Sequence, residues 1–143
     1  SAVLGLGATV ITNRREIAAD DFFVGMYTTA LDEGEIITAI RFPIPKRAAY
    51  MKFKQPASRF SLVGVFVAQF DAGVRVAVTG ASSCVFRHAG LEAALSGSFT
   101  PQAAAAVAID ASDLNADLHA SAAYRANLIS VQTQRAVAKM TSP

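Results

Sequence analysis

Short stretches in which apolar and polar residues alternate predict strands in the first part of the chain. Residues 2–12 are rich in Ala, Val, Leu and Ile, and we expect an opening strand there. A second short strand is expected around Ile17. Residues 35–42 alternate in the same way and predict a third strand, which Pro43 and Pro45 must end because proline interrupts regular backbone structure.

The alternation continues beyond these two prolines. Residues 50–55 predict another strand. Residues 62–70 are apolar on both alternating faces, so they form either a buried strand or a buried helix. Their high Val content, and the turn-forming residues 71–73 before a second Val-rich stretch at 74–78, favour a strand hairpin.

The remainder of the chain has helical signals. A short amphipathic helix is expected around Leu91. Thr100 followed by Pro101 predicts the cap and first turn of a helix through Val107, and Ser121 is expected to cap a final helix. The apolar stripe of that final helix comprises Tyr124, Leu128, Ile129, Val131, Arg135, Ala136 and Val137. About three strands in a meander and then about three helices predict an α+β fold, in which helices cover one face of an antiparallel three-stranded sheet.

Composition and length narrow the classes of protein that this chain can be. With 143 residues, 52% of them hydrophobic and 17% charged, the chain has enough apolar surface for a folded core, which excludes a disordered protein. The apolar stretches are far shorter than the roughly 20 residues that span a bilayer. The N-terminus lacks a signal-peptide pattern, so we expect a cytoplasmic protein. The two prolines mark the best internal boundary, and we expect one unit over residues 1–45 and another over residues 46–143.

Residue types that bind metals are scarce. Cys84 is the only cysteine, which excludes internal disulfides, iron–sulfur clusters and thiolate zinc sites, since each needs more than one sulfur ligand. We expect Cys84 to be a small buried hydrophobe, and His88 and His119 to cap helices or face solvent. No nucleophile with a matching base can be nominated for a small hydrolase. We therefore expect no catalytic residue and no metal in this chain.

Acidic and glycine-rich stretches are weaker candidates. Asp20 and Asp21 predict a helix N-cap or the polar edge of a loop, and the acids of residues 32–35 are typical of a solvated turn. Gly5 and Gly7 lack the third glycine of a phosphate-binding loop, so close packing of the backbone explains them better.

Charged residues are distributed unevenly along the chain. Residues 36–70 contain Lys and Arg but no acid, whereas residues 88–124 contain acids but no Lys or Arg. Lys52 and Lys54 share one face of a predicted strand, with Arg59 just beyond. This cationic strand is either a solvated sheet face or a surface that binds an anion, such as a phosphate, a reduced cofactor or an acidic partner. The net charge of +2 is too small to argue for nucleic acid.

A series of short motifs runs along nearly the whole chain. The motifs are residues 6–10, 15–17, 21–25 and 35–40, Phe42-Pro43, Phe53-Lys54-Gln55, residues 76–81, Phe86-Arg87 and residues 112–125. In this order they resemble the FAD-binding (medium) subunit of molybdenum hydroxylases, closest to that of aerobic carbon monoxide dehydrogenase. The resemblance implies the last strands of a FAD-binding domain over residues 1–45 and a flavoprotein C-terminal domain over residues 46–143.

The resemblance implies FAD as the cofactor of the longer subunit. The two glycine-rich loops that hold the FAD pyrophosphate in this family do not occur in the chain. The resemblance implies two flavin-site residues: Ile37, in Glu-Ile-Ile, matches the family's aliphatic residue that packs against the flavin ring, and Lys54, in Phe-Lys-Gln, matches its flavin-site lysine. An aliphatic wall lowers the dielectric constant around the ring, and a cation favours the negative charge that develops on reduction.

The resemblance also implies partner subunits. In such oxidoreductases electrons pass from a molybdenum large subunit through an iron–sulfur small subunit to FAD. The chain would complete one side of the flavin pocket and dock against these partners, and we expect it to be inactive when isolated. The alternative is a non-catalytic α+β interaction module that binds an acidic protein through the cationic strand.

Overall fold

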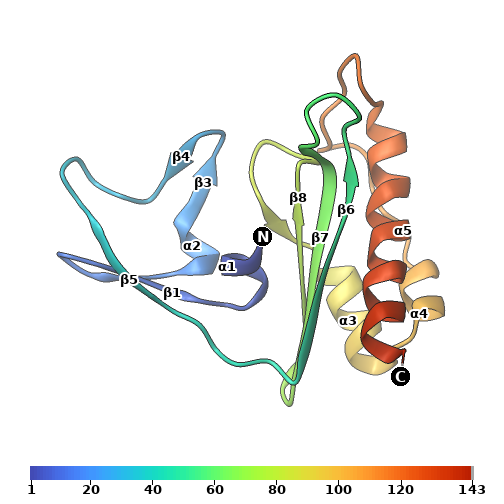
Figure 1. Ribbon diagram of the computed structural model, residues 1–143, viewed down its shortest axis with the longest axis horizontal. Coiled ribbons are helices and arrows are strands. Elements are labelled where there is room, and N and C mark those ends of the chain that lie inside the picture. Colours follow the sequence, from blue (N-terminus) through green and yellow to red (C-terminus); the bar gives the residue numbers. More distant parts are fainter. Residues whose placement is uncertain (143) are drawn as a thin grey trace.

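The computed structural model describes residues 1–142, whose strands form three separate antiparallel sheets (Figure 1). Before the two prolines the strands are β1 (Thr9–Thr12), β2 (Glu16–Ala18), β3 (Phe23–Gly25), β4 (Thr28–Thr29) and β5 (Ile37–Arg41). After the prolines they are β6 (Arg47–Lys54), β7 (Ser61–Phe70), β8 (Gly73–Thr79) and β9 (Phe86–Arg87). The helices are α1 (Ala2–Gly5), α2 (Ala19–Phe22), α3 (Ala89–Gly97), α4 (Pro101–Ala105) and α5 (Ala122–Thr141).

The predicted α+β fold is confirmed, with one addition to the C-terminal sheet. Its strand order is β6-β7-β8-β9, so the expected three-stranded meander carries a fourth strand. Strand β9 has only two residues, which are too few to form a recognisable alternating pattern. The hairpin of β7 and β8 pairs Phe70 with Gly73 across a two-residue turn, which settles the choice between strand and helix for residues 62–70.

Helices α3 and α5 cover one face of this sheet, as expected, and α4 packs against these two helices (Figure 1). The valines that alternate along β7 and β8 point to this side and are buried against the helices. The caps are also as predicted: the Thr100 hydroxyl accepts a hydrogen bond of 3.2 Å from the Ala103 N–H, and Ser121 accepts one of 3.2 Å from Tyr124. Helix α4 ends at Ala105, before the predicted Val107.

The stripe predicted on α5 is only partly correct. Leu128, Ile129, Ala136 and Val137 are buried, but Tyr124 and Arg135 are exposed. The additional buried side chains are Arg125, Ala126, Gln132 and Thr133. The helix is therefore rotated about its axis toward Arg125, whose guanidinium binds the ends of β7 and β8.

The start of the chain is helical, so the strand predicted over residues 2–12 is wrong before Thr9. Helix α1 packs on the second face of the C-terminal sheet, where Leu4 is buried beside Ala77. A Cβ atom at Gly5 would lie 2.5 Å from Cδ1 of Phe66, so the glycine allows this close approach. A single helical turn is too short for a hydrophobic pattern to distinguish from a strand.

The first three-stranded sheet, in the order β2-β1-β5, lies apart from the C-terminal sheet, with α1 between them (Figure 1). Residues 42–45 connect β5 to β6 without regular structure. The division of the chain into two domains at residue 45 stays a prediction. Within residues 1–142, no helix combines the length and hydropathy needed to cross a membrane.

Candidate functional site

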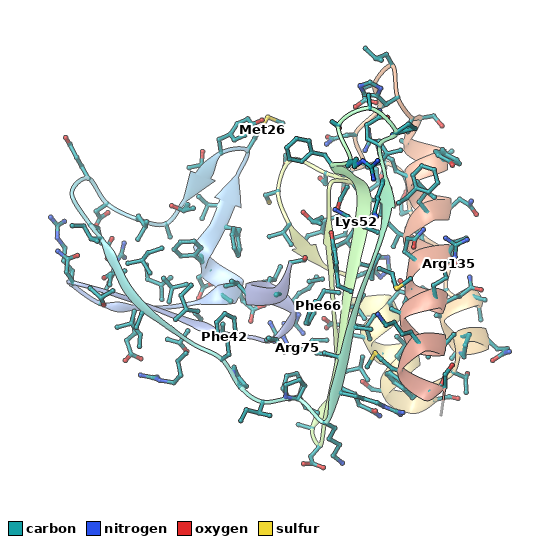
Figure 2. All side chains as sticks on the ribbon, viewed as in Figure 1. Met26, Phe42, Lys52, Phe66, Arg75 and Arg135 are labelled. Carbon is teal, nitrogen blue, oxygen red and sulfur yellow. The ribbon has the colours of Figure 1, made fainter. Side chains whose placement is uncertain are left out.

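The second face of the C-terminal sheet is only partly covered. Phe66 and Ala77 are neighbours across β7 and β8 and pack against α1. Tyr50, Lys52 and Lys54 on β6 point to the same side of the sheet and are exposed. We call these three residues the lysine face. Figure 2 shows Lys52 and Phe66 on this sheet and Arg135 on the opposite side, on α5.

The lysine face has a defined geometry. Tyr50 Oη and Ser61 Oγ are 2.7 Å apart, which ties β6 to the first residue of β7. Lys52 Nζ donates to the carbonyl oxygen of Arg59 at 3.3 Å. Among the residues that the structure describes, no carboxylate forms a salt bridge with Lys52 or Lys54, so these charges are available to an anion.

The loop between β6 and β7 is closed by its own backbone. The Gln55 N–H donates to the Phe60 carbonyl, and the Arg59 N–H donates to the Gln55 carbonyl, both at 2.8 Å. Arg59 has a φ of 60°, which is unusual for a residue with a side chain. The loop presents Phe60 to solvent and borders a cavity of about 270 Å³ with a largely polar lining.

Glu35 positions the strand that carries Ile37. Its carboxylate accepts hydrogen bonds from Thr12 Oγ1 at 2.7 Å, Arg15 Nη2 at 3.0 Å and the Asp32 N–H at 2.8 Å. The hydrogen bond from Arg15, followed by those from the Asp32 backbone and from Thr12, lowers the pKa of Glu35 to about 2. The expectation of a solvated turn is wrong for Glu35, because folding brings Arg15 from the neighbouring turn onto its carboxylate.

Ile37 lies at the start of β5, opposite Thr12 of β1. The residue before it, Ile36, is held by two hydrogen bonds to Asn13, of 2.9 Å to the side chain and 3.0 Å to the backbone. All of β5 is exposed, and the side chain of Ile37 is 40% exposed. Within residues 1–142 only β1 pairs with β5, so an aliphatic surface and a free strand edge lie side by side.

The structure does not bring Ile37 and Lys54 together. They belong to different sheets, and within the described chain no strand pairing joins those sheets. Each of the two residues is exposed on its own strand. The two predicted residues are therefore separate parts of any common site.

Arg125 is a buried residue whose role the sequence patterns did not reveal. Its Nη1 donates to the carbonyl oxygens of Leu62 at 2.8 Å and Gly80 at 2.9 Å, and its Nη2 donates to Asp117 at 2.7 Å. Arg125 thus links three segments: the start of β7, the end of β8 and the loop before α5. This fixes the base of the loop that follows Lys54.

A group of four charged residues joins the two parts of the chain, and we call it the seam network: Asp20, Arg75, Arg87 and Glu92. Arg75 and Arg87 both donate to Asp20, and Arg87 also pairs with Glu92. Asp20 was expected to cap a helix or to face solvent, but the cap position of α2 is Ala18 and Asp20 is an ion-pair residue. Asp21 is exposed, as a solvated acid should be.

The remaining candidates have structural roles. His88 caps α3, with Nδ1 accepting a hydrogen bond of 3.2 Å from the Leu91 N–H, as predicted. Cys84 is half-buried, so the prediction of a buried residue holds only in part, and it borders a cavity of about 330 Å³. Over residues 1–142 there is no group of three His, Cys, Asp or Glu side chains that could hold a metal ion.

Comparison with known proteins identifies relatives of this chain. It is 36% identical over 137 residues to the nicotine 6-hydroxylase medium subunit of Paenarthrobacter nicotinovorans, covering 89% of this chain and 48% of that subunit. It is 32% identical over 136 residues to the carbon monoxide dehydrogenase medium chain of Hydrogenophaga pseudoflava, covering 87% of this chain and 47% of that one. The chain is homologous to the medium subunits of molybdenum hydroxylases. It spans about half the length of these relatives, which fits a C-terminal part.

Solved structures confirm the fold. The chain superposes on quinoline 2-oxidoreductase from Pseudomonas putida with a TM-score of 0.80 and 24% identity, over 96% of this chain and 53% of that chain. It superposes on carbon monoxide dehydrogenase from Oligotropha carboxidovorans with a TM-score of 0.80 and 24% identity, over 97% and 54% of the two chains. No protein-family model matches the sequence.

Proposed function

We propose that the chain is part of the FAD-binding electron-transfer subunit of a molybdenum hydroxylase, where it completes the flavin pocket. The observation that carries this proposal is the match to medium subunits over nearly the whole chain. The exposed positions of Ile37 and Lys54 support it, since neither side chain is covered by the chain itself.

The residues fit one side of a flavin. When bound, FAD supplies the two-electron and one-electron chemistry by which electrons leave the complex. Ile37 would provide an aliphatic wall, because its β5 neighbours hold it at the surface without burying it. Lys54 would place a cation that no described carboxylate neutralises near the ring, where it favours added negative charge. The pyrophosphate would be held by glycine-rich loops outside this sequence.

A second candidate function follows from the same lysine face. Lys52, Lys54 and Arg59 have no acidic partner among residues 1–142, so they could dock an acidic protein instead. In that case the iron–sulfur and molybdenum subunits are the partners to consider. Docking and flavin binding can be separated, because the first affects assembly and the second affects the cofactor.

A chimeric subunit tests the proposal. Residues 1–143 replace the matching part of the Hydrogenophaga pseudoflava medium chain, which is co-expressed with its partner subunits. We expect Lys54→Ala to lower the reduction potential of the flavin without loss of assembly, because the removed cation favours the reduced state. Lys139→Ala, on the last turn of α5, is the matched control.

The outcomes distinguish the two candidate functions. A flavin potential in Lys54→Ala equal to that of the Lys139→Ala control contradicts the flavin role. Loss of partner subunits on gel filtration, with normal flavin content, supports the docking role in its place. Ile37→Asn should reduce the flavin content, whereas Ile44→Asn at a more exposed position should not.

A further inference from the structure

Ile37 and Lys54 need a fixed mutual position if they contact one flavin. Their strands, β5 and β6, belong to different sheets, and the connection between them has no regular structure. Two parts joined in this way move relative to each other unless the contact surface between them prevents it. We call the contact surface between residues 1–45 and residues 46–142, beside α1, the seam. The contacts at the seam therefore decide how Ile37 and Lys54 are oriented relative to each other.

Every hydrogen bond in the described chain that links residues 1–45 to residues 46–142 comes from Arg75 or Arg87. Arg75 Nη2 donates to the Leu4 carbonyl at 2.9 Å and to the two carboxylate oxygens of Asp20 at 2.9 and 3.0 Å. Arg87 Nη1 donates to the same carboxylate at 3.1 Å. Asp20 thus accepts three of these four bonds and is the acid through which the first part is attached.

The apolar part of the seam does not replace these bonds. Leu4, Ala8, Ala19 and Ala77 form its centre, and partly buried side chains pack around them: Val3, Phe23, Phe66 and Val85. Apolar contacts of this kind are attractive but not directional, so they permit rotation and sliding. Two guanidinium groups on one carboxylate, in contrast, have a preferred geometry. Figure 2 shows Arg75 on the side of the C-terminal sheet that faces α1.

The C-terminal side of the seam network is held rigidly. Glu92 accepts a hydrogen bond of 2.8 Å from Arg87 Nε and forms a salt bridge with Arg87 Nη2 at 2.5 Å. The same carboxylate accepts the Val76 N–H of β8 at 2.9 Å. Arg87 is therefore oriented by Glu92 independently of Asp20, whereas the Arg75 side chain bonds only to Leu4 and Asp20 of the first part. Partial burial raises the pKa of Asp20, but the hydrogen bonds from Arg75 and Arg87 outweigh it and lower the pKa overall.

We propose that Asp20 is a positioning residue that fixes the β2-β1-β5 sheet, with Ile37, relative to β6 and Lys54. It does so by engaging Arg75 and Arg87 together, without contacting either site residue. The mechanical part of this proposal concerns the chain alone, and its meaning for a cofactor rests on the proposed function.

Distance measurements between two spin labels test the mechanical part. The labels are attached to Glu33→Cys, on the first part, and Ala138→Cys, on α5, in a Cys84→Ser background; both labelled positions are exposed. We expect the distance distribution to become roughly twice as wide, or to shift, in Asp20→Asn. Asp21→Asn is the matched control, because its side chain is exposed and forms no salt bridge in residues 1–142.

A distribution in Asp20→Asn that superimposes on those of the parent and Asp21→Asn overturns the proposal, since apolar packing alone would then hold the seam. If Asp20→Asn does not fold, the double variant Arg75→Gln/Arg87→Gln takes its place, because it removes both arginines that bind Asp20. The same widening is expected there, and an unchanged distribution overturns the proposal equally. Circular dichroism shows which variants are folded.

The flavin potential of the chimera separates this proposal from the proposed function. A wider distance distribution together with a shifted potential in Asp20→Asn supports both. A wider distance distribution with unchanged flavin content and flavin potential supports the positioning role of Asp20 but contradicts a shared flavin pocket. An unchanged distance distribution in Asp20→Asn, together with a shifted flavin potential in Lys54→Ala, contradicts the positioning role of Asp20. The proposed flavin pocket is then still supported.

Discussion

Single residues in this protein acquire their chemical state from neighbours that are distant in the sequence. Glu35 stands in a turn-like stretch of acids, yet its carboxylate is buried and bound by Thr12, Arg15 and the Asp32 backbone. Burial of a charge is tolerated only when it is paired and hydrogen-bonded in this way. The result is a fixed support for Ile36 and Ile37.

The lowered pKa of Glu35 predicts that the stability of the fold depends on pH. The ordinary value is 4.5 and the folded value is about 2, so the carboxylate stabilises the fold fully above about pH 4.5. This stabilisation is lost as the pH falls through about 2. Glu35→Gln should therefore lower the urea midpoint at pH 7, and the difference from the parent should shrink as the pH falls from 4.5 toward 2.

Urea unfolding, followed by circular dichroism at several pH values, measures the difference in midpoint between the parent and Glu35→Gln. Glu33→Gln, an exposed neighbour, is the control and should leave the midpoint unchanged at every pH. A difference between parent and Glu35→Gln that stays constant between pH 7 and 2 would show that the ion pair with Arg15 does not stabilise the fold.

At the scale of elements, strand ends are held by side chains rather than by further pairing. Arg125 of α5 reaches the carbonyl groups of Leu62 and Gly80 and the carboxylate of Asp117. Gly80 has a φ of 80°, and a Cβ atom there would lie 2.5 Å from the Ser61 carbonyl oxygen, so β7 and β8 approach closely at this end. The helix and the two strand ends therefore form one mechanical unit below the loop of residues 55–60.

Removal of this arginine should destabilise the C-terminal sheet. The side chain of Arg125 is 4% exposed, and Arg125→Met would leave two carbonyl oxygens and one carboxylate without their donor. We expect a loss of about 3 kcal/mol in the free energy of unfolding, measured by urea titration. Arg135→Met, on the exposed side of the same helix, should change it by less than about 0.5 kcal/mol. Equal effects of the two substitutions would contradict the role given to Arg125.

At the scale of the whole molecule, the two residues proposed for the flavin site lie on separate surfaces, Ile37 on β5 and Lys54 on β6. The free edge of β5 and the lysine face of β6 are both exposed, and the seam network lies between the two parts. The chain spans about half the length of the medium-subunit relatives that it matches. Exposed apolar and charged surfaces of this kind are typical of docking faces.

This arrangement predicts that the isolated chain purifies without flavin. Tight binding of a dinucleotide needs backbone N–H groups around the pyrophosphate, and this sequence has no glycine-rich loop to supply them. The visible absorption spectrum of the purified chain, before and after incubation with FAD and gel filtration, measures this. A yellow chain with one flavin per molecule would contradict the prediction.

Local patterns determined much of the fold from the sequence alone. The Val alternation of β7 and β8, the prolines after β5, and the caps Thr100 and Ser121 each act within a few residues, so the printed sequence contains them. The order of the motifs also pointed to the medium subunits that the comparisons find as relatives, because it depends on many short matches together. The absence of paired cysteines limited the metal chemistry in the same direct way.

Only the tertiary structure decided which charged residues are solvated and which are structural. Asp20, Glu35 and Arg125 look like ordinary polar residues, and their charged partners lie from 8 to 67 positions away in the sequence. No pattern with a period of two or 3.6 residues encodes such pairs, because they depend on how whole elements pack. The same packing put Ile37 and Lys54 on different sheets and brought Arg75 and Arg87 of the C-terminal sheet onto Asp20.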